Sequence, residues 1–177
     1  MSVLEIARRY VAGGLSVVPI MADGSKRPAV PWKALQQKRP TDAELVRWFG
    51  PEKHGLAIIC GQVAGNLEVL DFDDGEACFA WRDLVETELP GLLGKLPVVS
   101  TPRGGFHVYY RLPHRPAGNQ KLALRRGGET LIETRGEGGY VLAPGCPAAC
   151  HPSGGLYVQV SGPELPAVPQ IEQVPLA

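Results

Sequence analysis

Residues 67–74 read Leu67-Glu68-Val69-Leu70-Asp71-Phe72-Asp73-Asp74, an apolar run that ends in three carboxylates. The run predicts a β-strand, in which side chains two positions apart project to the same face. Asp71 and Asp73 therefore point the same way, and their charges repel unless a cation neutralises them. Mg²⁺ takes one or two carboxylates together with substrate phosphates, which favours a metal site here. The alternative is a simple strand end followed by a helix capped by Asp74.

Short elements on both sides of this strand predict an α+β fold. Glycine and proline together make up 39 of 177 residues, about 22% against an average near ~12%, which argues against a helical bundle. Helical periodicity or capping residues predict helices near residues 2–12, 41–49 and 74–89. Apolar runs between turn residues predict further strands at 15–20, 55–60, 98–101, 106–111, 130–134, 140–143 and 156–160.

Composition and charge exclude several classes of protein. Eighteen basic and eighteen acidic residues cancel, so no overall field attracts nucleic acid or a membrane surface. No apolar run reaches the ~18 residues of a membrane span, and the charged N-terminus is unlike a signal peptide. Four irregularly spaced cysteines indicate reduced thiols and a cytoplasmic protein. The proline-rich stretch 161–177 predicts a linker after a catalytic domain at 1–160, leading to a C-terminal helicase or accessory domain.

A second motif is Ser100-Thr101-Pro102-Arg103-Gly104-Gly105-Phe106-His107-Val108-Tyr109-Tyr110. Glycine lets a backbone approach an anion closely, and arginine pairs with phosphate oxygens. His107 shares a strand face with Tyr109 and Arg111, while Phe106 and its alternate neighbours occupy the other face. A glycine-rich turn between two strands is the alternative interpretation.

A third motif is Leu131-Ile132-Glu133-Thr134-Arg135-Gly136-Glu137-Gly138-Gly139-Tyr140-Val141. Glu133 lies between apolar neighbours of a predicted strand and is a candidate third metal ligand, or else a solvent-facing charge. Farther on, Cys146, Cys150 and His151 offer zinc-type ligands. Structural zinc takes four ligands and no fourth is near in sequence, so unliganded cysteines are favoured.

In this order, the motifs resemble those of the N-terminal primase/polymerase domain of the archaeo-eukaryotic primase superfamily, found in plasmid, phage and integrated-element replication proteins. The likeness runs from Ala7 to about Tyr157. It also includes the segments Lys26-Arg27-Pro28 with Trp32, and His151-Pro152-Ser153-Gly154-Gly155. Glu133 stands where many relatives have aspartate, and residues 145–150 depart from the family pattern.

The resemblance implies a fold in which an RRM-like antiparallel or mixed sheet carries the catalytic acids beside a smaller α/β subdomain. It implies that Asp71, Asp73 and Glu133 hold two Mg²⁺ or Mn²⁺ ions, with His107 also catalytic. Contacts with the incoming dNTP or NTP are expected from Ser100, Thr101, Arg103, Gly104, Gly105, His107, Arg135 and Tyr140. The reaction implied is transfer of a nucleotide to a 3′-hydroxyl on a single-stranded DNA template.

Two other functions compete with this one. A strand ending Asp-x-Asp also opens the haloacid-dehalogenase phosphatases, in which Asp71 would be the nucleophile. Those enzymes place the strand near the start of a Rossmann-like domain, whereas about seventy residues precede it here and hairpins follow. The other alternative is a nucleic-acid-binding module that has lost activity. Its weakness is that folding does not require Asp71, Asp73, His107 and Glu133.

Overall fold

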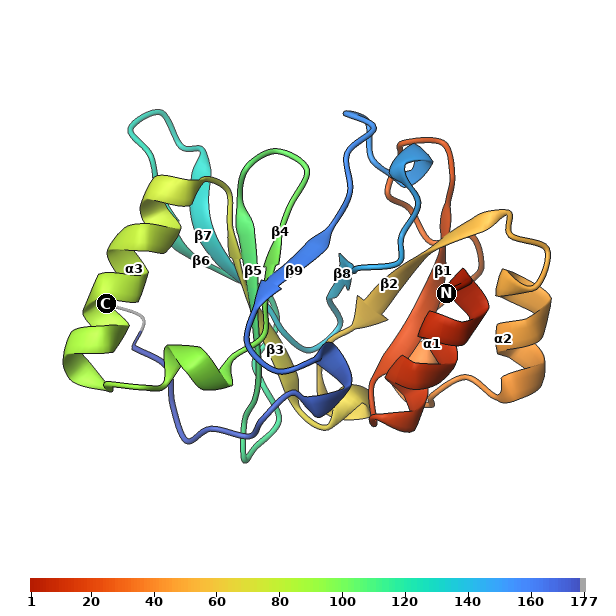
Figure 1. Cartoon of the computed structure of the whole chain (residues 1–177), viewed down its shortest axis with the longest axis horizontal. Coiled ribbons are helices and arrows are strands. Elements are labelled where there is room, and N and C mark those ends of the chain that lie inside the picture. The colour runs from red at the N-terminus through yellow and green to blue at the C-terminus, as the bar shows by residue number, and fades with distance from the viewer. Residues whose placement is uncertain (176–177) are drawn as a thin grey trace.

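The computed structural model describes residues 1–175 and shows two lobes side by side (Figure 1). We call residues 1–60 and 140–151 the small lobe, and residues 67–135 with 158–161 the large lobe. The small lobe contains α1 (Val3–Ala12), β1 (Ser16–Met21), α2 (Asp42–Phe49), β2 (His54–Ile59) and β8 (Tyr140–Leu142). The large lobe contains β3 (Leu67–Phe72), α3 (Gly75–Glu88), β4 (Val98–Ser100), β5 (Phe106–Arg111), β6 (Gln120–Leu124), β7 (Thr130–Arg135) and β9 (Val158–Ser161).

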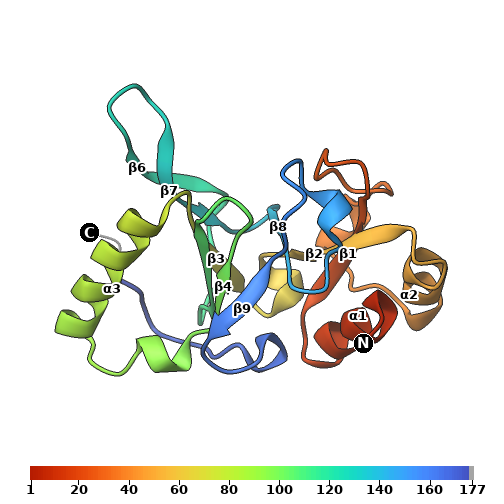
Figure 2. The ribbon, with the colours of Figure 1, turned by 45° about the horizontal axis from the view of Figure 1, so that its top comes forward.

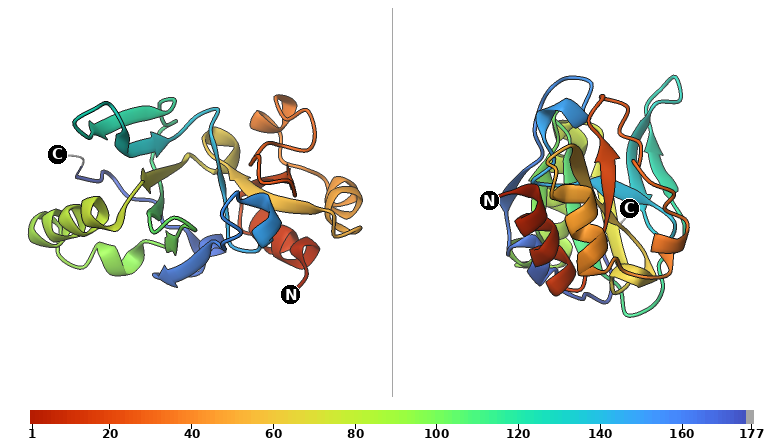
Figure 3. Two further views of the ribbon diagram at one scale, coloured as in Figure 1. Left: turned by 90° about the horizontal axis from the view of Figure 1, so that it is seen from above. Right: turned by 90° about the vertical axis from the view of Figure 1, so that its right-hand side faces the viewer.

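Each lobe has its own sheet, and all strand pairs within them are antiparallel. The small sheet has the order β1-β2-β8, and the large sheet has the order β6-β7-β3-β5-β4-β9. Seen from above, α3 lies along the outer side of the large lobe, while α1 and α2 lie at the far end of the small one (Figure 3). The predicted α+β class is confirmed.

The three helices begin where their capping residues predict. Ser2 and Glu5 form a capping box at α1, and Thr41 and Glu44 form another at α2. The Asp74 side chain accepts a hydrogen bond from the Ala77 amide, 2.9 Å away, at the start of α3. Each such cap satisfies backbone N–H groups that a helix start leaves unpaired, and contributes about 1 kcal/mol.

Strand β6 was not predicted, because the segment around it is polar. The strand lies at the sheet edge with largely exposed side chains, and its only apolar residues, Leu122, Ala123 and Leu124, form a run too short to predict a strand. It pairs with β7 to form a hairpin that rises above the large lobe (Figure 2). The hairpin carries the basic residues Lys121, Arg125 and Arg126.

The two faces of the large sheet pack into different cores. On one face, Leu67, Val69 and Tyr109 join the core of the small lobe. On the other face, Leu70 and Phe72 pack with Trp81 under α3. Strand β3 lies between β5 and β7 and contributes to both cores, which fixes its side chains firmly.

The last segment of the chain, predicted to be a linker from residue 161, packs against both cores. Leu165 and Val168 are buried in the core of the small lobe, and Ile171 and Val174 pack on the core under α3. The Trp81 Nε1–H donates to the Pro175 carbonyl over 2.7 Å. A C-terminal region after the tail stays a prediction, and residues 176–177 lie outside the described part of the chain.

Within residues 1–175, no helix combines the length and the apolar character that crossing a bilayer requires.

Candidate active site

Three predicted site residues form a row across three neighbouring strands. Asp71 of β3 lies opposite His107 of β5 on one side and opposite Glu133 of β7 on the other. This register brings His107, 36 positions after Asp71, and Glu133, 62 positions after it, onto one face near the end of β3. The strand pairing itself therefore assembles the site.

Asp71 is held between two basic side chains. His107 Nε2 lies 3.4 Å from Asp71 Oδ1, and Arg135 donates to Oδ2 from Nη2 at 3.3 Å. Burial alone would raise the pKa of Asp71, but His107 and Arg135 outweigh it and lower that pKa below its ordinary value. The His107 ring is buried, and its Nδ1 has no hydrogen-bond partner among residues 1–175. Unpartnered buried polar atoms are rare and often mark functional sites.

The guanidinium of Arg135 also forms an ion pair with Glu133. Two carboxylates on adjacent strands thus converge on one cationic group, which shows that both can reach a single positive centre. Hard divalent cations prefer carboxylate oxygens, and Mg²⁺ takes one or two of them with the rest from water and phosphate. Asp71 and Glu133 fit that requirement. In the described part of the chain, no three His, Cys, Asp or Glu side chains are grouped closely enough to hold one ion.

Asp73 lies just beyond β3, beside the turn that carries Arg103. Burial and the negative charge of Asp71 raise the pKa of Asp73, and Arg103 opposes them. The turn is closed by a hydrogen bond of 2.9 Å from the Thr101 amide to the Gly105 carbonyl. A Cβ at Gly105 would lie 2.1 Å from the Phe72 carbonyl oxygen, so only glycine lets the turn rest on the end of β3.

A polar cavity of about 690 Å³ opens beside this row, with Asp71 and His107 in its lining and Glu133 outside it. The predicted residues that line it are Asp71, Asp73, Thr101, Arg103, His107 and Arg135. The lining also includes six residues that the sequence motifs did not predict at this site: Lys26, Asp74, Arg125, Glu129, His151 and Tyr157. Among these, Arg125 of the β6–β7 hairpin forms an ion pair of 2.5 Å with Asp74. Basic residues cluster between positions 121 and 126 in the sequence, but that clustering does not predict the contact with Asp74.

Two predicted nucleotide-binding residues are engaged elsewhere. The Ser100 hydroxyl donates to the Val158 carbonyl of β9 over 3.3 Å, and Ser100 does not line the cavity. The Tyr140 hydroxyl donates to the Lys26 carbonyl over 3.0 Å, and its ring packs edge-on against Trp32. Tyr140 lines a smaller neighbouring cavity of about 240 Å³, which also contains Asp71 and Arg135.

The structure separates the three candidate zinc ligands into two groups. The thiols of Cys146 and Cys150 lie together in the core of the small lobe, where a Cβ at Gly55 would come within 2.6 Å of both sulfur atoms. His151 instead contacts Ser153 through Nδ1 and lines the polar cavity. Two thiols supply two of the four ligands of structural zinc, so a zinc site stays a prediction.

Comparison with protein families adds a decisive observation. The family model described as "bifunctional DNA primase/polymerase, N-terminal" matches residues 7–175, nearly the whole chain. The chain belongs to the Prim-Pol family. A search of curated proteins finds no match to it. Membership in the Prim-Pol family confirms the resemblance seen in the motifs, and with it a DNA primase/polymerase activity in the general sense, that of a nucleotidyltransferase in DNA replication.

The fold also bears on the phosphatase alternative. Haloacid-dehalogenase phosphatases need a strand inside a parallel, Rossmann-like sheet, whereas β3 is antiparallel to both of its neighbours. The Prim-Pol domain instead places the Asp71 carboxylate between histidine and arginine side chains.

Proposed function

We propose that this Prim-Pol domain transfers nucleotides from dNTPs or NTPs to a 3′-hydroxyl on a single-stranded DNA template, with Mg²⁺ or Mn²⁺ as cofactor. The observation that carries the proposal is the row of Glu133, Asp71 and His107, of which Asp71 and His107 line a polar cavity, in a chain of this family. The row supplies carboxylates for cations, and the basic side chains around it supply partners for phosphates.

Asp71 and Glu133 would hold the divalent cation, and Asp73, at the rim of the cavity, would hold a second one together with Asp71. When bound, such cations lower the pKa of the attacking hydroxyl and stabilise charge on the leaving group. Their arrival would also release Arg135 from the two carboxylates that it pairs with here. The released guanidinium would remain beside the cavity, free to pair with phosphate oxygens.

The protein groups of the site would position and neutralise the substrate without forming a covalent bond to it. Arg103 and Thr101 stand on the turn that rests on the end of β3, so their distance from Asp71 is set by the rigid sheet. His107 would orient Asp71 through the contact already present, and would donate to phosphate once the carboxylate is engaged by a cation. Fixed donors of this kind stabilise developing charge without reorganisation during the reaction.

The surroundings of the site suggest where the template binds. The β6–β7 hairpin brings Arg125 to the cavity and exposes Arg126 near its tip. Basic side chains bind the phosphate backbone of DNA without reading its sequence. We further propose that the domain acts in the cytoplasm in the replication of a plasmid, phage or integrated element. We expect a C-terminal helicase or accessory domain to add further contacts with the template.

Primer extension tests this proposal directly. The wild-type domain should add labelled dNTPs or NTPs to a primed single-stranded template when Mg²⁺ or Mn²⁺ is present, and chelation should stop the reaction. Glu133→Gln should remove activity and Glu133→Asp should retain part of it, because the shorter carboxylate keeps the charge. Binding of the template without any incorporation, under all metal and nucleotide conditions, would instead support the inactive binding module.

A further inference from the structure

We propose that Cys146 and Cys150 form a reversible redox pair, two thiols that hydrogen peroxide converts to a disulfide. Both side chains lie in the core of the small lobe, and neither lines the polar cavity of the candidate active site. The proposed nucleotidyl transfer uses neither thiol, so the pair would have this chemistry whether or not the domain is a polymerase. The contact of the two sulfur atoms beside Gly55 of β2 is what marks them as a pair.

The two sulfur atoms lie side by side over a glycine. A Cβ at Gly55 would come within 2.6 Å of both of them, so they are less than about 5 Å from each other. The thiols of Cys146 and Cys150 also form a hydrogen bond with each other. Only glycine at position 55 leaves room for two sulfur atoms against the strand. The sulfur atoms of a disulfide are about 2 Å apart, so rotation of the side chains with a small movement of the backbone would join them.

A short turn carries both thiols and is held by its own bonds. Its last part is the 3₁₀ turn η4 (Ala148–Cys150), in which the Cys150 amide donates to the Pro147 carbonyl over 3.0 Å. Within residues 1–175, no backbone hydrogen bond joins residues 146–150 to a segment outside 143–151. A segment held by local bonds opens at a smaller free-energy cost than the whole domain.

The thiols lie just below the surface. Cys146 is 4% exposed and Cys150 is fully buried, whereas Pro147 and Ala149 between them are exposed. Local opening of the turn would therefore bring both sulfur atoms to solvent while the sheet beneath stays folded. Hydrogen peroxide is small enough to reach them in such an opening.

The reaction balances with one molecule of hydrogen peroxide. One sulfur, as thiolate, attacks a peroxide oxygen and breaks the O–O bond, which gives a sulfenic acid and hydroxide. The other sulfur attacks the sulfenic sulfur, forms the S–S bond and releases the oxygen as water. The two thiols thus lose two electrons and two protons, and the peroxide becomes two molecules of water. A small dithiol reverses the step by thiol–disulfide exchange.

A zinc site would use the same thiols but needs further ligands. His151, the next residue after Cys150, contacts Ser153 through Nδ1 instead of joining the thiols. Among residues 1–175, no group of three His, Cys, Asp or Glu side chains could hold a metal ion. A disulfide needs two sulfur atoms and no third group, so the geometry favours oxidation over zinc binding.

The turn also connects the thiols with the polar cavity. It leads directly to His151, whose side chain lines that cavity. A disulfide joins both ends of the turn covalently and removes its opened conformations. Oxidation would therefore hold this wall of the cavity in its folded position.

The test oxidises the whole folded chain with hydrogen peroxide, in the presence of a chelator and without denaturant. The mass of the protein should fall by two hydrogen atoms, peptide mapping should locate the disulfide between Cys146 and Cys150, and dithiothreitol should restore both thiols. Amide hydrogen exchange of residues 146–151 should be slower in the oxidised protein. Cys150→Ser and Cys146→Ala should form no disulfide.

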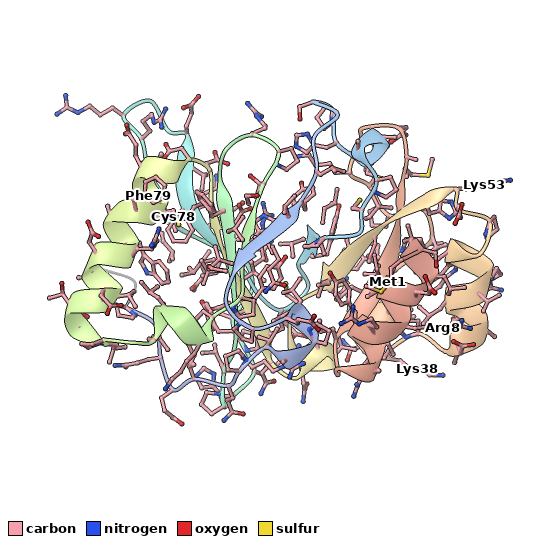
Figure 4. All side chains as sticks on the ribbon, in the orientation of Figure 1. Met1, Arg8, Lys38, Lys53, Cys78 and Phe79 are labelled. Atoms are coloured by element: carbon pink, nitrogen blue, oxygen red, sulfur yellow. The ribbon has the colours of Figure 1, made fainter. Side chains whose placement is uncertain are left out.

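Cys78→Ser is the matched control. Cys78 is as deeply buried as Cys150 but lies on α3 in the large lobe (Figure 4), so this variant should form the disulfide as the wild type does. Thermal melts check that each variant is folded.

Four results would overturn the redox pair. Four intact thiols after treatment with millimolar peroxide, or sulfinic acid without a disulfide, would show that the two sulfur atoms do not reach each other. A disulfide between two chains, seen on a non-reducing gel, would assign the reaction to other contacts. Zinc that purifies with the wild type but not with Cys150→Ser, and that protects both thiols until it is chelated, would assign them to a metal site. Unchanged amide exchange in a protein that does form the disulfide would overturn the effect on the cavity wall.

Discussion

Strand β3 carries one carboxylate on each face, buried Glu68 and half-buried Asp71, and their environments are opposite. Asp71 faces the cavity and lies opposite His107 of β5, with Arg135 on its other side. Glu68 faces the other way and lies opposite Tyr110 of β5, whose hydroxyl donates to it over 2.5 Å. Basic neighbours lower the pKa of Asp71, whereas burial raises the pKa of Glu68. The environment on one face of β3 thus favours the ionised form of Asp71, and the environment on the other face favours the protonated form of Glu68.

This difference shows how a single strand serves stability and chemistry at once. A buried charge costs free energy unless charged or hydrogen-bonding partners stabilise it. At Asp71 those partners are present, and they are groups that a cation could displace. At Glu68 the partner is a neutral hydroxyl within the packed sheet. We therefore expect changes at Asp71 to affect activity and changes at Glu68 to affect stability alone.

The largest effect should come from Asp71→Asn. The amide keeps the size of the side chain but removes the charge that would hold a cation, so nucleotide incorporation should fall by about four orders of magnitude or more. The Tm should change little, because Arg135 keeps its ion pair with Glu133. Asp73→Asn should also abolish incorporation. Extension at near wild-type rate by either variant would contradict the cation assignment.

Phe72→Ala tests the helix-facing side of the same strand, one residue away. Phe72 is fully buried and packs on Trp81 of α3, with ring centroids 5.3 Å apart. The cavity left behind should reduce the free energy of unfolding by about 3–5 kcal/mol in urea titrations. Leu124→Ala is the control: because Leu124 is 56% exposed, its truncation should change the free energy of unfolding little. A loss as small in Phe72→Ala as in the control would show that this core is not tightly packed.

Arg103→Ala tests the face of β3 that looks into the cavity and leaves every carboxylate of the site in place. Removing one charge-assisted hydrogen bond to phosphate should weaken affinity for the incoming triphosphate about ten- to a hundredfold. Stability should be unaffected, because Arg103 is exposed and makes no ion pair with a described residue. Calorimetry with a dNTP measures the affinity, and Arg126→Ala on the hairpin tip is a comparison of equal charge. Equal affinities for the dNTP in the two variants would show that Arg103 does not contact the nucleotide.

The smallest effect concerns Glu68→Gln. The amide oxygen still accepts from Tyr110 and no charge is buried, so stability at pH 7 should rise by about 1 kcal/mol. Because its folded-state pKa is raised, Glu68 binds a proton more readily in the folded than in the unfolded protein. The wild-type protein therefore becomes more stable, as far as Glu68 is concerned, when the pH falls through the pKa that Glu68 has in the folded state. Urea titrations at pH 7 and pH 5 should show the advantage of the variant shrinking at the lower pH.

Primer extension by Glu68→Gln should equal that of the wild type. A strong loss of activity in this variant would mean that the two faces of β3 are not separate in function.

The sequence predicted which residues of one strand share a face, but it did not predict which residues of neighbouring strands lie opposite each other. Alternation alone showed that His107 and Tyr109 share a face, and the capping residues located all three helix starts. The contact of Arg135 with Asp71 depends on the register between β3 and β7, which no local pattern encodes. Lys26 reaches the cavity from the other lobe, more than forty residues before Asp71. The position of Lys26 depends on how the two lobes pack together, which no local sequence pattern shows.

The packing of residues 161–175 has a consequence for how the domain is made. Leu165 and Val168 complete the core that α1 and the small sheet begin, and Glu164 pairs with Arg9 of α1 at 2.6 Å. The core beside α1 is therefore incomplete until residues 161–175 are in place. Contacts between such distant segments slow folding. During synthesis, the nascent chain would expose the apolar face of α1 until residues 161–175 have been made and cover it.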